Sequence, residues 1–145
     1  PGSDKPDIST PEKHKTALLS ARRTAFSDPA RGATIGTHFM KVIESLGIKD
    51  AVLKKATLAQ DGVETMRLVL EKKVDLGVTQ VSEVVQANPD ALVGPFPGEF
   101  DLATTFSLWY PTTISPAAKG FVTLITGPAG RAKLTKDGLR APLER

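Results

Sequence analysis

The chain has 145 residues, of which 40% are hydrophobic and 24% charged, a balance typical of a globular domain with a buried core. The net charge is only +3, and the basic residues are scattered without interleaved aromatic residues, which disfavours nucleic-acid binding. No apolar run approaches the roughly 20 residues of a membrane-spanning helix. The absence of cysteine excludes disulfides and thiolate chemistry.

The first part of the chain is predicted to be a tail, a helix and a strand. Residues 1–9 are polar and interrupted by proline. Thr10-Pro11-Glu12 then combines a capping residue, a first-turn proline and an acid, which together favour a helix start. We expect this helix to run to about Arg22 and a short strand to occupy 24–27.

A loop rich in small residues, 27–37, links this strand to a helix predicted to begin near His38. The first N–H groups of a helix have no partner within the helix, and they point into such a loop. Two interpretations follow. Either this is an ordinary strand-to-helix loop with Thr34 or Thr37 as the helix cap, or it is a cradle for a polar or anionic ligand group.

Strands and helices are predicted to alternate up to Val93. The elements expected after the loop are, in chain order, helices over 38–47 and 48–55, a strand over 57–59, a helix over 61–73, a strand over 74–80, a short helix from Ser82 and a strand over 91–93. Val63, Met66, Val69 and Leu70 are expected on the buried side of the helix over 61–73. This alternation favours an α/β fold with a small, mostly parallel sheet flanked by helices.

A proline- and glycine-rich break over 94–98 separates this alternation from a different pattern. A longer extended run is predicted over 101–110. Two helices are expected after it, over 115–126 and 128–137, and Gly127-Pro128 separates them.

No group of residues has the spacing of a catalytic or metal-binding site. His14 and His38 lie in separate helices without ligand partners nearby, and no nucleophile motif or nucleotide-binding glycine motif is present. We predict no enzymatic activity, no cofactor and no bound metal. Backbone N–H groups could instead gather beyond the carboxyl ends of the strands, at Thr34-Ile35-Gly36, at Gly62-Val63 and at Gln80.

Several short motifs, each occurring once, follow one another in a characteristic order along the chain. They are Ser27-Asp28-Pro29-Ala30, Gly32-Ala33-Thr34, Leu46-Gly47-Ile48, Asp75-Leu76-Gly77-Val78, Gln80, Ser82-Glu83 and Leu92-Val93-Gly94-Pro95. Together they resemble the molybdate-binding-protein-like periplasmic solute receptors of ABC importers, over about 7–142. The resemblance implies a type 2 periplasmic binding fold, in which two α/β lobes close on a ligand. It also implies a carboxyl-terminal portion of such a receptor, with a solute-binding lobe over 7–94 and a segment over 95–145, a returning strand and two helices, that crosses back to the other lobe.

The resemblance also implies a set of ligand-binding positions. These are Ile35, or Thr34 in its place, in the loop before one helix, Val63 at a later helix start, and Gln80 where the family has a tyrosine. Gly36 joins this set as a neighbouring backbone amide in the same loop. Gln80 offers both a donor and an acceptor, and Asp61 places a carboxylate beside the amide of Val63. Both departures disfavour molybdate, and Gln80 suits a small organic solute at least as well.

The function implied is the solute-binding component of an ABC importer in the periplasm, which binds a small polar or anionic solute and engages the membrane permease. The alternative is the ligand-sensing domain of a transcriptional regulator with the same fold. The apolar residues of 101–110 would lose their cover without the other lobe. We expect this segment either to fold back on its own lobe or to pair with the same segment of a second chain, and we favour the homodimer.

Overall fold

The computed structural model describes residues 4–140. The chain divides into two compact units, Pro1–Leu102 and Ala103–Arg145, and each is described by itself. The first unit has an α/β architecture, as predicted from the alternation of strands and helices.

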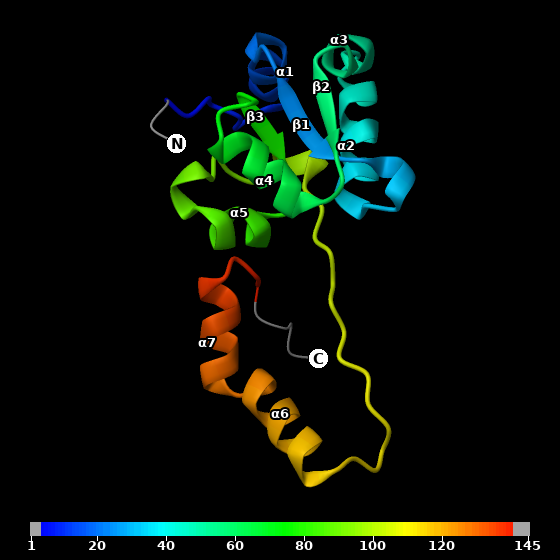
Figure 1. The fold of residues 1–145 in the computed structure, drawn as a ribbon, viewed down its shortest axis with the longest axis vertical. Coiled ribbons are helices and arrows are strands. Elements are labelled where there is room, and N and C mark those ends of the chain that lie inside the picture. Colours follow the sequence, from blue (N-terminus) through cyan, green and yellow to red (C-terminus); the bar gives the residue numbers. More distant parts are fainter. Residues whose placement is uncertain (1–3, 141–145) are drawn as a thin grey trace. The chain divides into compact units, whose positions relative to one another are not determined.

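The sheet of the first unit has three parallel strands in the order β2-β1-β3. They are β1 (Thr24–Ser27), β2 (Ala56–Ala59) and β3 (Leu76–Val78). Thr24 of β1 is paired with Ala56 on one side and with Leu76 on the other, which sets the register of all three strands. The carboxyl ends therefore meet at one edge of the sheet (Figure 1), where open parallel sheets bind ligands.

Helices cover both faces of this sheet (Figure 1). On one face α4 (Gly62–Leu70) contacts all three strands, and on the other α2 (Thr34–Ser45) contacts β1 and β3. Helices α1 (Pro11–Ser20) and α3 (Lys49–Leu53) contact each other and extend the layer that contains α2. Because successive residues of a strand point to opposite faces, each strand contributes side chains to both of these helical layers.

Two apolar clusters occupy these two faces. The cluster beneath α2 contains Leu18, Phe26, Phe39, Val42, Ile43, Leu46, Ile48, Val52 and Val78, and the cluster beneath α4 contains Ala25, Ala59, Leu68 and Val74. Phe26 and Phe39 are fully buried and meet edge to face with ring centroids 4.9 Å apart. The larger cluster fixes α2, and with it the strand-to-helix loop, against the sheet.

The start of α2 differs from the prediction. The helix begins at Thr34, one turn before His38, and neither predicted threonine cap is correct: Ala33 is the cap residue and makes no side-chain cap hydrogen bond. The reason lies in the preceding turn, where a short 3-10 helix (Pro29–Arg31) ends at Gly32 in the left-handed conformation with φ 81°. That turn points the chain into the helix earlier than its apolar pattern indicates.

The buried side of α4 was predicted correctly only in part: Met66 is buried and Val69 is partly buried against the cluster beneath α4, as expected. Val63 and Leu70 are exposed at 73% and 37%, whereas Gly62, Thr65, Met66 and Leu68 are buried. Gly62 lies inside at the first position of the helix, and the helical period then places Thr65 and Met66 beneath it and turns Val63 outward.

Strand β3 is also shorter than the predicted strand over 74–80. It begins only at Leu76, because the preceding Asp75 accepts hydrogen bonds from the N–H groups of Arg22 and Arg23 at 2.9 Å.

No strand forms at 91–93. After α5 (Val81–Ala87), the Asn88 side chain accepts a hydrogen bond from Asp90 N at 2.9 Å and starts a short 3-10 helix, Pro89–Ala91. A further 3-10 turn spans Gly98–Phe100. Phe96 and Phe100 pack against the larger apolar cluster, so the unit continues past the glycine-proline break.

The second unit contains the two helices that the sequence predicts, α6 (Pro116–Thr126) and α7 (Pro128–Lys136), and they pack against each other. Ser115 caps α6 by accepting a hydrogen bond from Ala118 N at 3.2 Å. Residues 101–110 form neither a helix nor a strand, and their side chains are exposed.

Candidate functional site

A cavity of about 300 Å³ lies in the first unit beyond the carboxyl ends of the strands. We call it the site cavity, and it is lined by Ser27, Arg31, Gly32, Ala33, Thr34, Ile35, Gln60, Asp61, Gly62, Gln80 and Glu83. Three segments far apart in the sequence therefore meet here, at the starts of α2, α4 and α5. The structure brings Thr34, Ile35 and Gln80 together, whereas Gly36 and Val63 are not among the lining residues.

The first wall is the turn that leads into α2. Asp28 holds this turn by accepting a hydrogen bond from Ala30 N at 2.9 Å. Gly36 then passes so close to β1 that a Cβ atom on it would lie 2.0 Å from the carbonyl oxygen of Ser27. Within residues 4–140 no hydrogen bond is made by the N–H groups of Thr34, Ile35 and Gly36, whereas Thr37 N donates to Ala33 O at 3.0 Å. These N–H groups are donors at the positive end of a helix.

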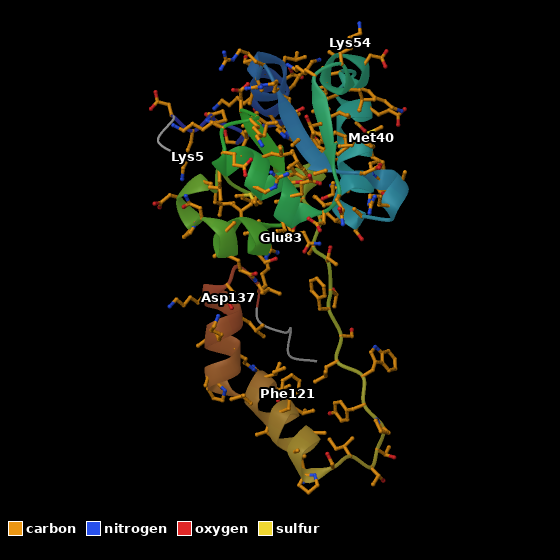
Figure 2. The ribbon with its side chains drawn as sticks, viewed as in Figure 1. Lys5, Met40, Lys54, Glu83, Phe121 and Asp137 are labelled. Atoms are coloured by element: carbon orange, nitrogen blue, oxygen red, sulfur yellow. The ribbon has the colours of Figure 1, made fainter. Side chains whose placement is uncertain are left out.

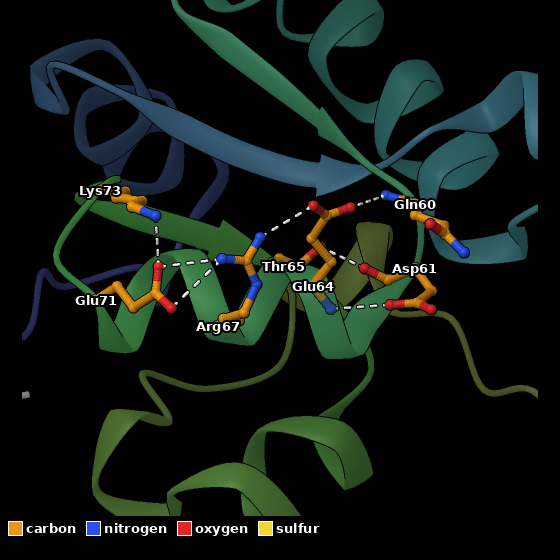
Figure 3. Close-up of polar contacts among 7 residues, drawn as sticks. All are labelled: Gln60, Asp61, Glu64, Thr65, Arg67, Glu71 and Lys73. Atoms are coloured by element: carbon orange, nitrogen blue, oxygen red, sulfur yellow. Dashed lines mark hydrogen bonds and ion pairs between the residues drawn. The ribbon is translucent and has the colours of Figure 1, made fainter.

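The second wall is the start of α4 (Figure 3). Asp61 caps this helix by accepting a hydrogen bond from Glu64 N at 2.8 Å, and the Glu64 carboxylate in turn accepts one from Gln60 N at 2.6 Å. Arg67 pairs with Glu64 at 3.2 Å and with Glu71 at 3.1 Å along the exposed side of the helix. The first turn of α4 is therefore held by its own side chains.

Val63 follows Gly62 in α4 but does not line the cavity. Its side chain is exposed, and its N–H group, at the second position of α4, has no hydrogen-bond partner among the residues that the structure describes. The amide is therefore an unpaired donor one residue beyond Gly62, which lines the cavity.

The third wall is the start of α5, where Figure 2 labels Glu83. Gln80 is the cap residue of this helix, and its N–H donates to Glu83 Oε2 at 3.1 Å. The hydroxyl of Thr79 donates to the same oxygen. The carboxylate also reaches α4, because a Cβ atom on Gly62 would lie 2.0 Å from Glu83 Oε2.

Charged side chains of both signs line the cavity. Arg31 is basic, whereas Asp61 and Glu83 are acidic. Glu83 was not predicted as a ligand-binding residue, although Ser82-Glu83 is one of the motifs that carry the resemblance and Glu83 lies three residues after the Gln80 cap. The contact between Glu83 and Gly62 joins two helix starts that lie far apart in the sequence.

A larger cavity of about 920 Å³ lies elsewhere in the first unit, along α1, β3 and residues 90–96. His14 lines it, and burial lowers the pKa of this imidazole. His14 Nδ1 has no hydrogen-bond partner in the part of the chain that the structure describes, and the ring lies 5.2 Å from that of Phe96. The second histidine, His38, contacts the carbonyl oxygen of Phe100 at 2.7 Å.

Within residues 4–140, no three His, Asp or Glu side chains are arranged to hold a metal ion. In the same range, no helix has both the length and the apolar character needed to cross a bilayer.

The family model described as bacterial extracellular solute-binding protein matches residues 1–140. The chain belongs to this bacterial solute-binding protein family. No curated protein and no solved structure matched the chain. Family membership places this solute-binding protein in the periplasm or outside the cell, and proteins of this family generally have no catalytic activity. The three-stranded α/β unit corresponds to one lobe of such a protein.

Proposed function

We propose that this solute-binding protein holds a small polar or anionic solute in the site cavity and delivers it to the permease of an ABC importer. The observation that carries the proposal is the meeting of three helix starts around one cavity at the carboxyl edge of a parallel sheet. Ligands of open α/β sheets bind at this edge. The family match supports solute binding, and the sequence motifs support the importer role.

The proposed ligand contacts are mainly backbone donors. The N–H groups of Thr34, Ile35 and Gly36 would bind acceptor atoms of the solute, and the N–H group of Val63 would add a donor from the second wall. The Gln80 side chain contributes both a donor and an acceptor. Fixed amides suit a transport receptor because they orient a solute without reacting with it.

Transport would use closure of a second lobe over the solute. The site cavity provides contacts from one lobe only, while the entropy lost on binding is much the same as for a complete site. We therefore expect the 145-residue chain to bind its solute with a dissociation constant of about 1 mM or weaker, which corresponds to a binding free energy of about −4 kcal/mol. The closed, two-lobed form would be the one that the permease recognises.

Segment 101–110 is proposed to take part in protein contacts. Phe106, Leu108, Trp109 and Tyr110 are exposed at 69%, 48%, 90% and 55%. Exposed apolar side chains in succession are a feature of interaction surfaces. We propose that they pair with the other lobe in a complete receptor and with a second copy in the isolated chain.

The variant Thr34→Pro tests the proposed role of the α2 amides. Proline is tolerated at the first position of a helix, and Ala33 already has the extended conformation, φ −66° and ψ 116°, that a following proline requires. The variant removes one donor and retains the helix. We expect it to weaken binding of whichever amino acid, organic acid or oxyanion binds best by about fivefold or more. Thr34→Ala is the matched control, since it keeps the N–H group, and equal affinities for the two variants would refute the amide contact.

A further inference from the structure

The carboxylate of Glu83 lies beside the first residue of α4, although no N–H group of α4 in the described residues donates a hydrogen bond to it. A Cβ atom on Gly62 would lie 2.0 Å from its Oε2 and 2.3 Å from its Oε1, so the carboxylate lies directly against the first residue of the helix. Its Oε2 also accepts hydrogen bonds from Thr79 and Gln80 at the start of α5. Negative charge is favoured at helix N-termini. The chain thus supplies its own anion to this side of the site cavity.

Asp61 adds a second negative charge to the same side. Its Oδ1 accepts a hydrogen bond from Glu64 N at 2.8 Å, and the residue lines the cavity with Glu83. In the described part of the chain, Asp61 Oδ2 and Glu83 Oε1 accept no hydrogen bond. Two carboxylate oxygens therefore remain as acceptors for a ligand, and a free oxyanion placed beside them would be repelled.

The part of the cavity formed by Arg31 and the start of α2 has the opposite polarity. The starting N–H groups of α2 are unpaired within 4–140, and the side chain of Arg31 makes no ion pair in that range. Both features favour a negatively charged group. The cavity thus has a positive wall at Arg31 and α2 and a negative wall at Asp61 and Glu83.

We propose that the site cavity selects a small zwitterion of the amino-acid class. The carboxylate of the solute binds the α2 amides and Arg31, and its ammonium group binds Asp61 and Glu83. The volume of about 300 Å³ is at the lower end of the range for ligand cavities and suits a small solute. This inference rests on the proposed function, because it specifies the solute class of the same cavity.

The test compares glycine with its two halves, acetate and methylammonium, and with molybdate. Each is titrated into the 145-residue chain, and dissociation constants are taken from NMR shifts of the amides that line the cavity. Glycine is expected to bind at least about tenfold more tightly than acetate, methylammonium or molybdate, because only glycine satisfies both walls.

Two variants remove charge from the negative wall without removing a cap. Glu83→Gln and Asp61→Asn keep residue types that cap helices well, so the fold of each start is retained. Each is expected to weaken glycine binding by about tenfold and to leave acetate binding unchanged or tighter. Asp50→Asn, on the exposed side of α3, is the control and should bind glycine as the parent chain does.

The outcomes separate this inference from the proposed function. Acetate or molybdate binding at the cavity as tightly as glycine would overturn the zwitterion proposal and leave solute binding at this site intact. Unchanged glycine affinity in both variants would also overturn it. No shift of any cavity amide with any of the four probes would overturn the proposed function along with the inference.

Discussion

The close approach of Gly36 to β1 makes a quantitative prediction. In Gly36→Ala, the new Cβ atom would lie 2.0 Å from the carbonyl oxygen and 3.1 Å from the carbonyl carbon of Ser27, and 3.2 Å from the nitrogen of Pro29. All three are backbone atoms, so no side chain can move aside to make room. Overpacking costs about 1–3 kcal/mol in ordinary cores. We expect the upper end here, about 3 kcal/mol, because β1 is held in the sheet on both sides.

This loss is measurable by urea unfolding followed by circular dichroism at 222 nm. In thermal unfolding, the same loss of about 3 kcal/mol corresponds to a fall in melting temperature of roughly 12–24 °C for a unit of this size. Gly98→Ala is the matched control, since it lies in the same unit and a Cβ atom there meets nothing within 4 Å. It should change stability by less than about 0.5 kcal/mol. If Gly36→Ala is as stable as Gly98→Ala, the turn into α2 does not approach β1 as described.

Three further predictions concern pH, capping and assembly. Burial lowers the pKa of His14 below its ordinary value of 6.5, so acid favours the unfolded chain, which takes up the proton first. The free energy of unfolding should therefore fall as the pH drops below 6.5, and this fall should be less steep in the variant His14→Phe. If the free energy of unfolding depends on pH equally in the parent chain and the variant, His14 is not buried as a neutral ring. Asp61→Ala should lose about 1 kcal/mol in urea unfolding through loss of the α4 cap, whereas Asp61→Asn should lose much less. Sedimentation at micromolar concentration should show a dimer that Trp109→Ser weakens, and a strictly monomeric parent chain would contradict the proposed pairing.

The parts of the fold that the sequence predicts are those that depend on local apolar period and on caps. Phe39, Val42 and Ile43 recur at helical spacing and are buried, so the existence of α2 follows from its pattern. Its start does not, because the entry angle depends on Gly32 in the left-handed conformation and on the close passage of Gly36 beneath Ser27. Both features depend on contacts and backbone angles of the folded chain, which the spacing of apolar residues along the sequence does not reveal.

The same distinction applies to the site. That Thr34, Ile35 and Gln80 meet at one cavity follows from strand–helix alternation, because parallel strands end at the same edge. The exposure of Val63 could not be predicted from the sequence, because its apolar side chain matches the spacing of the buried residues of α4. The side chain points outward only because Gly62, the residue before it, faces inward. The contact between Glu83 and Gly62 joins the starts of α5 and α4 on one side of the cavity, and nothing in the spacing of these residues indicates it.

Mapping where the solute binds shows whether the site cavity is the solute site. Amide shifts of the whole 145-residue chain should be followed by NMR during titration with whichever of glycine, acetate, methylammonium and molybdate binds best. We expect the largest shifts at Ile35, Gly36, Val63 and Gln80, around the carboxyl edge of the sheet. Shifts that centre instead on His14, Leu18 and Val93, around the larger cavity, would contradict this expectation.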